Sequence, residues 1–77
     1  MRALVPLSML SEGEEGKIVL IKGGYGLTRR LAELGFNPET RVKVLRAIGG
    51  PIVVLVRDSR IAIGRGVAMK IFVEVER

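Results

Sequence analysis

The side chains that most often carry catalysis are absent from this sequence of 77 residues. It contains no histidine and no cysteine, so it offers neither an imidazole that titrates near neutral pH nor a thiolate nucleophile. Its few hydroxyl groups stand in no nucleophile motif. A chain this short also leaves no room for a pocket of ~300 Å³ or more. The composition predicts a protein that is not an enzyme and uses no cofactor.

Three carboxylates gather in one short segment. Glu12, Glu14 and Glu15 lie within residues 11–16, beside two glycines. Transition metals are normally held by histidine or cysteine, and hard cations need several converging oxygen ligands. The segment therefore predicts a solvated acidic turn and no metal site. A weak divalent transition-metal binder stays open as an alternative function, which calorimetry with ferrous iron would test.

A glycine-rich segment, residues 23–26, precedes a helical pattern. Backbone N–H groups at the start of a helix can cradle an anion. The segment lacks the Lys-Ser or Lys-Thr ending of a phosphate-binding loop, and it also lacks the dinucleotide-binding fingerprint. It therefore predicts a strand-to-helix turn that uses glycine for its backbone freedom.

Positive charge is concentrated in the second half of the chain. The formal net charge is +5, and residues 41–70 contain seven basic side chains and a single acid, Asp58. Such a half indicates an acidic partner, a nucleic acid or simple solubility. Small barrels that bind nucleic acid also offer aromatic platforms, and this chain has only Tyr25, Phe36 and Phe72. Nucleic acid binding is therefore the second choice, and it would use Arg41, Lys43, Arg46, Arg57 and Arg60.

Short apolar segments separated by turn residues predict a β protein. Hydrophobic residues make up 48% of the chain, mostly the branched aliphatic types that favour strands. Pro6 cannot donate to a ladder, so residues 4–10 are expected to form an edge strand or a strap across a barrel. Asp58 and Ser59 predict a two-residue hairpin connection. Further strands are expected at residues 17–22, 41–48 (with Val42, Val44 and Ile48 on the dry face), 52–57, 60–63 and 70–75, and a single helical turn at 64–68.

One longer helix is expected at residues 27–34. Leu27, Leu31 and Leu34 are spaced so that they share one helix face. Gly35 stands where a left-handed C-cap belongs, and residues 37–40 predict a turn. The leucine face is expected to form a lid on the rest of the domain.

A sheet of such short strands buries its core and protects its edges best by closing on itself. We therefore predict a single domain, residues 1–77, that is all-β: a small SH3-like barrel of five to six strands with one short inserted helix. An OB-like barrel is the main alternative. A homodimer is compatible with this size, because a small domain buries little surface alone.

The order of these segments resembles the FeoA family of ferrous iron transport accessory proteins. The resemblance covers residues 7–75, and it rests on the combined order of its parts. Leu-Gly-Phe-x-Pro-x-Thr follows the helix, and Gly-Pro-Ile opens the next strand. The stretches are LSMLSEGEEGKIVLIKGG (7–24), LTRRLAELGFNPETRVKVL (27–45), GPIVVLVR (50–57) and IAIGRGVAMKIFV (61–73).

The resemblance implies an SH3-like barrel that works in the cytosol beside FeoB, the membrane transporter of ferrous iron with a cytosolic G-protein domain. The same fold occurs as a C-terminal domain of iron-dependent repressors, and with no preceding helix-turn-helix this chain resembles the stand-alone form. The family often has glycine where this chain has Glu39, which leaves the turn type open. The lack of histidine and cysteine favours a protein-binding adaptor over an iron carrier.

The helix is the expected partner surface, since an apolar anchor rimmed by charge is a typical docking patch. A sheet edge that accepts a partner strand is a second possibility. We expect a cytoplasmic location and no membrane insertion, because cysteine is absent, no cleavage site follows the N-terminal apolar run and no segment approaches ~20 apolar residues. The residues expected to bind FeoB are Tyr25, Leu27, Arg29, Arg30 and Leu34.

Overall fold

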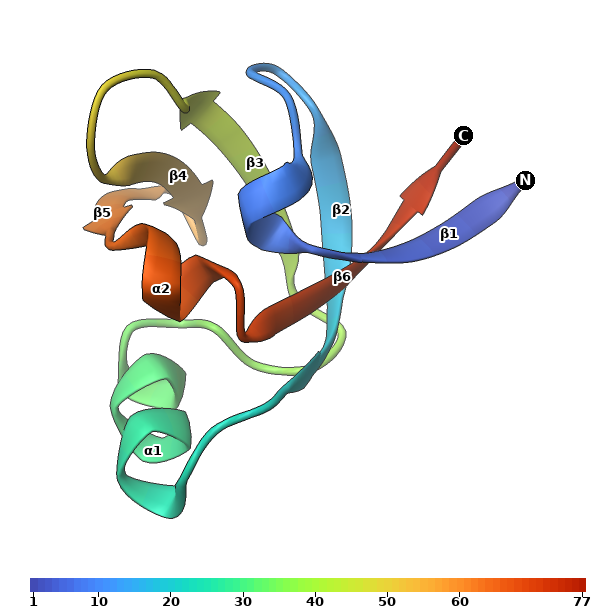
Figure 1. Cartoon of the computed structure of the whole chain (residues 1–77). Helices are drawn as coiled ribbons and strands as arrows, with labels where there is room; N and C mark the ends of the chain where they lie inside the picture. The colour runs from blue at the N-terminus through green and yellow to red at the C-terminus, as the bar shows by residue number, and fades with distance from the viewer.

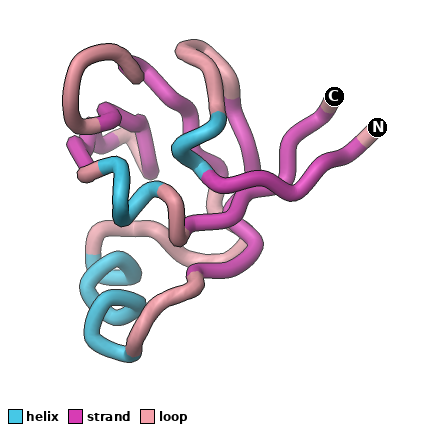
Figure 2. Tube along the Cα trace, in the orientation of Figure 1, coloured by secondary structure: helices cyan, strands magenta, loops and turns pink.

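The computed structural model describes residues 1–77. The chain folds into six strands, one helix of two turns and two shorter helical turns (Figures 1 and 2). No helix is long and apolar enough to cross a membrane. In chain order the elements are β1 (Arg2–Pro6), the 3-10 turn η1 (Leu7–Met9), β2 (Glu15–Ile21), α1 (Tyr25–Glu33), β3 (Arg41–Arg46), β4 (Ile52–Val56), β5 (Ser59–Ile63), α2 (Arg65–Ala68) and β6 (Ile71–Glu76).

The strands form a single antiparallel sheet in the order β1-β6-β2-β3-β4-β5. The sheet curls around one core, with η1 and α2 inside its curve and α1 beyond the end of β2 (Figure 1). Register shifts at Val44/Arg46 and at Ile18/Leu20 mark β-bulges, which bend strands and increase their twist. The prediction of a mostly β domain of five to six strands with one inserted helix is confirmed.

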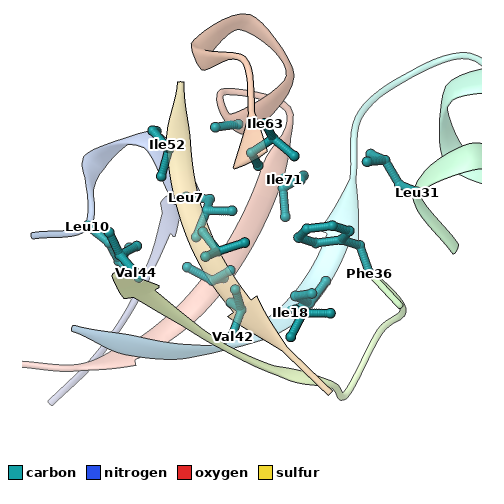
Figure 3. Close-up of a cluster of buried hydrophobic side chains, with 14 of the residues drawn as sticks. Leu7, Leu10, Ile18, Leu31, Phe36, Val42, Val44, Ile52, Ile63 and Ile71 are labelled. Atoms are coloured by element: carbon teal, nitrogen blue, oxygen red, sulfur yellow. The ribbon is translucent and has the colours of Figure 1, made fainter. Parts of the chain in front are cut away.

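The core is entirely apolar. Alternate residues of β3, β4 and β6 point inward, as the period of a strand requires. Leu7 and Leu10 reach the core from the η1 segment, while Leu31 and Phe36 reach it from the α1 segment (Figure 3). No polar or charged side chain is buried.

Two predicted strands end at least two residues earlier than expected. The strand expected at 4–10 ends at Pro6, and a 3-10 turn follows that buries Leu7. The strand expected at 41–48 ends at Arg46, and Ile48 lies 74% exposed in the next turn. The assignment of Ile48 to the dry face was wrong, because the bulge after Val44 breaks the alternation.

The hairpin between β4 and β5 turns one residue before the predicted position. Val56 pairs with Ser59, so Arg57 and Asp58 form the connection and not Asp58 and Ser59. Arg57 has φ 49° and Asp58 has φ 65°. Positive φ at both central residues characterises the type I′ turn, which matches the twist of the strands it joins. Aspartate tolerates this conformation better than most residues.

Candidate protein-docking surfaces

Helix α1 is held by its two leucines that face the core. It begins at Tyr25, two residues before the predicted start, after Gly24 at the N-cap. Leu31 is 3% exposed, and Leu27 is half-buried against the same core. A Cβ on Gly23 would stand 2.7 Å from Cδ2 of Leu27, so Gly23 leaves the space that Leu27 occupies. The lid role predicted for Leu27 and Leu31 is confirmed.

The outer side of α1 carries the remaining predicted partner residues. Tyr25 is 82% exposed and Leu34, the C-cap residue, is 45% exposed. The i, i+7 spacing of Leu27 and Leu34 predicted that Leu34 shares the buried face with Leu31. In the structure Leu34 is exposed and does not. Arg29 pairs with Glu33 at 3.9 Å, whereas Arg30 makes no ion pair. We call Tyr25, Arg29, Arg30 and Leu34 the α1 outer face.

The α1 outer face has the chemistry of a docking patch. Tyr25 and Arg29 are four residues apart, as are Arg30 and Leu34, so each pair lies on one side of the helix. Tyrosine and arginine are enriched among the residues that dominate protein interfaces. Leu27, the fifth predicted residue, lies under this surface and supports it from inside.

Five basic side chains of the second half lie on β3 and β5 or in the β4–β5 turn. Lys43 is in register with Leu55, and Leu55 with Arg60. A surface hollow of about 360 Å³ runs beside them. Nη2 of Arg41 lies 3.3 Å from Oε1 of Glu15, and this ion pair partly neutralises the arginine. The hollow is lined by Glu15, Arg41, Val42, Lys43, Leu55, Arg57 and Asp58.

The aromatic residues lie elsewhere. Tyr25 is on α1, Phe36 is buried, and Phe72 lies on β6 with Nζ of Lys22 5.1 Å from its ring centroid. The basic face of β3–β5 therefore has charge but no stacking platform for bases.

A larger hollow, of about 470 Å³, lies where β1, β6, β2 and β3 meet. The expectation that a chain this small has no hollow above ~300 Å³ was therefore wrong. Oppositely charged side chains line it in pairs. Glu74 lies 3.6 Å from Nη1 of Arg2 and 3.9 Å from Nζ of Lys17. Because the charges compensate one another, the hollow presents no unmatched group for a substrate.

The three clustered carboxylates each have a separate partner. Glu12 accepts a hydrogen bond from the Ala47 N–H at 2.9 Å, and Glu15 pairs with Arg41. Glu14 accepts the Ser11 N–H at 3.0 Å and two hydrogen bonds from Arg77 at 3.3 Å. These hydrogen bonds lower the pKa of Glu14. The bond from the Ser11 N–H contributes most, and the bonds from Arg77 come second.

No group of three histidine, cysteine, aspartate or glutamate side chains converges in a way that could hold a metal ion. Glu12 and Glu14 instead fasten the β1–β2 loop to its neighbours. The sequence did not suggest this role, because the partners Ala47 and Arg77 are 35 and 63 residues away.

The fold defines a small β domain, a six-stranded antiparallel sheet curled around an apolar core with no buried polar side chain. The model of the FeoA domain matches residues 5–75. A protein of Methanocaldococcus jannaschii named "Putative Fe(2+) transport protein A" is 44% identical over 71 residues, which is 92% of this chain and 87% of that protein. The chain belongs to the FeoA family, as the resemblance indicated.

Solved structures of FeoA proteins superpose on this chain. The crystal structure of an iron uptake regulatory protein, FeoA, superposes with a TM-score of 0.86 at 37% identity, covering 92% of this chain and 95% of that one. FeoA of Stenotrophomonas maltophilia, crystallised with zinc and described as a prokaryotic SH3 domain protein, gives a TM-score of 0.75 at 27% identity, covering 92% and 94%. The prediction of an SH3-like barrel is confirmed, and the family is one of ferrous iron transport.

Proposed function

We propose that this protein is a small cytoplasmic accessory and regulatory subunit of ferrous iron uptake that binds the cytosolic region of the FeoB transporter. Family membership supports the link to ferrous iron transport. The absence of a buried polar group supports a binding role over a catalytic one, because no enclosed site exists where water could be excluded from a reaction.

The observation that carries the proposal is the exposure of Tyr25 and Leu34 on α1. The buried face of the helix needs only Leu27 and Leu31 to hold it on the barrel. Large apolar side chains that a fold leaves exposed on its surface are candidate anchors for a partner. Arg30 lies one helical turn from Leu34 and makes no ion pair, so it is free to meet an acidic group.

The test is a pull-down with the purified cytosolic region of FeoB, with random duplex DNA as the competing bait. We expect saturable binding that survives moderate salt. Arg30→Glu and Leu34→Glu should each weaken binding by about tenfold or more, since both belong to the α1 outer face. Ile48→Glu is the matched control, because Ile48 is also an exposed apolar residue but lies in the β3–β4 turn.

Binding to DNA alone, lost as salt rises, would overturn the proposal and favour the basic face of β3–β5. Equal effects of Leu34→Glu and Ile48→Glu would show that the α1 outer face is not the docking surface.

A further inference from the structure

Strand β5 is the last strand of the sheet, and its outer edge is free. It pairs only with β4, no other element makes an extensive contact with it, and it lies at the margin of the molecule (Figure 1). Val56 and Ser59 close a two-residue hairpin, and the residue pairs of such a ladder alternate between hydrogen-bonded and non-hydrogen-bonded. Arg60 and Ala62 therefore direct their N–H and C=O groups away from β4.

These backbone groups are available to a partner. Arg60 and Ala62 are both exposed, and neither takes part in the backbone hydrogen bonds of turns and loops. A row of unpaired donors and acceptors on an edge strand is a template for another strand.

The opposite edge of the sheet, on β1, offers less. The Arg77 N–H donates to the Met1 carbonyl, so by alternation Arg2, Leu4 and Pro6 face the free side of β1. Pro6 has no N–H, which removes a donor from that edge. Arg2 is also paired with Glu74 and Glu76 at 3.6 and 3.4 Å. Only the β5 edge combines free backbone groups with unmatched charge.

The face beside the β5 edge carries positive charge that the chain does not compensate. Lys43, Arg46, Arg57 and Arg60 make no ion pair, whereas the carboxylates of β2 and β6 are paired with other cations. Lys43 and Arg60 flank Leu55 in one cross-strand row. An acidic segment that docks here would gain both charge complementarity and an accelerated encounter.

We propose that the β5 edge binds an extended acidic segment of a partner protein, which adds to the sheet as a further strand. Its side chains would alternate: acidic residues on the outer side near Arg60, and apolar residues on the inner side near the half-buried Ile61. This surface is separate from the α1 outer face, and the proposal does not depend on the identity of the partner that α1 binds.

The backbone requirement distinguishes this ligand from nucleic acid. A polynucleotide could use the four cations, but it would leave the N–H and C=O groups of Arg60 and Ala62 without strand partners. The face also lacks an aromatic side chain on which a base could stack.

The test uses the full chain labelled with nitrogen-15 and an acetylated, amidated peptide of alternating glutamate and valine, seven residues long. We expect chemical-shift changes centred on β5, slower hydrogen exchange of the Arg60 and Ala62 amides, and affinity that falls with salt. A peptide with lysine in place of glutamate should not bind, and one N-methylated at alternate amides should bind about tenfold more weakly or worse.

Two variants separate the edge from the charge. Ala62→Pro removes only an N–H that faces away from β4, so the hairpin should stay folded while peptide affinity falls by about tenfold. Arg60→Glu should cause a similar loss of about tenfold through charge reversal. The amide spectrum of each variant checks that the barrel is intact.

The proposal is overturned if the peptide perturbs α1 instead of β5, if Ala62→Pro binds as well as the parent chain, or if random duplex DNA binds the same amides more tightly than the peptide. Protection of the Arg60 and Ala62 amides that rises with protein concentration alone would also overturn it, since the edge would then be joining two copies of this chain.

Discussion

Gly35 lies directly against Val56. A Cβ on Gly35 would stand 2.9 Å from Cγ1 of Val56, and Gly35 has φ 106°. This contact sets the end of α1 against the end of β4. The predicted role of Gly35 as a left-handed helix terminator is therefore confirmed, but the glycine is also required for space.

Gly35→Ala should destabilise the domain for both reasons. The backbone strain and the clash together should lower the free energy of unfolding by about 2–4 kcal/mol, measured by urea denaturation. Gly13→Ala is the matched control: Gly13 has φ 87° but nothing within 4 Å of a built Cβ, so it should lose only about 1–2 kcal/mol. Equal losses in the two variants would show that the contact with Val56 contributes nothing.

Leu31 and Leu34 should separate the stability of α1 from its binding. Leu31 is 3% exposed and Leu34 is 45% exposed. Leu31→Ala should cost about 2–4 kcal/mol of unfolding free energy through the cavity it leaves, whereas Leu34→Ala should change it by less than about 1 kcal/mol. Thermal and urea denaturation of both variants measures this. A large loss for Leu34→Ala would mean that Leu34 serves packing and not docking.

The barrel could be predicted from sequence because its signals are local. Proline in the first segment marks an edge strand, glycine ends the helix, and alternating valines in residues 41–44 and 71–75 mark strands with one buried face. Each signal depends on neighbours within a few positions, where backbone sterics and side-chain period decide the structure.

The errors in the assignment of buried faces occurred where the regular period of a strand or helix is interrupted. Ile48 appeared to continue an alternating strand, but the bulge after Val44 moves it into an exposed turn. Leu34 matched the helical period of Leu27, yet it lies at the C-cap, where the chain already leaves the helix. A bulge and a helix end both shift the period by a fraction of a turn, and no pattern of apolar residues reveals such a shift.

The candidate site could be predicted only in part, because part of it depends on which strands lie side by side. The arginines of α1 were expected on the surface because a short helix has one buried face. The free edge of β5 depends on strand order, and the sequence of β5 does not state which strands lie beside it. The pairing of Lys43 with Leu55 and of Leu55 with Arg60 likewise becomes visible only in the sheet.

Glu14 should make the stability of the domain depend on pH. Its pKa is lower in the folded state than the usual glutamate value of about 4.3, first because the Ser11 N–H donates to it and then because of Arg77. A lowered folded pKa gives stability that is present above the unfolded pKa and is lost as the pH falls through the folded value. Glu14→Gln should therefore be less stable than the parent chain at pH 7 and should approach it as the pH falls through the folded pKa of Glu14.

Arg77→Gln is the control for this prediction. It removes the guanidinium but keeps the Ser11 hydrogen bond, so it should retain part of the pH dependence. Urea denaturation at a series of pH values measures all three proteins. A constant difference between Glu14→Gln and the parent chain at every pH would show that ionisation of Glu14 is not the cause.

Glu39 occupies a turn position where glycine should be better. Glu39 has φ 75°, in the left-handed region that side chains disfavour. Its backbone is fixed, because the Glu39 N–H donates to the Ile18 carbonyl at 2.8 Å. Its side chain makes only an exposed pair with Lys17 at 3.7 Å, and such pairs contribute little.

Glu39→Gly should therefore raise the free energy of unfolding by about 0.5–1 kcal/mol. Glycine relieves the left-handed strain, and this gain should exceed two costs: the lost ion pair with Lys17 and the greater conformational freedom of the unfolded chain. Glu39→Ala keeps the strain and loses the pair, so it should be no more stable than the parent chain. Urea denaturation distinguishes the two variants at once. If alanine stabilised the domain as much as glycine, the carboxylate and not the backbone would be the source of the cost.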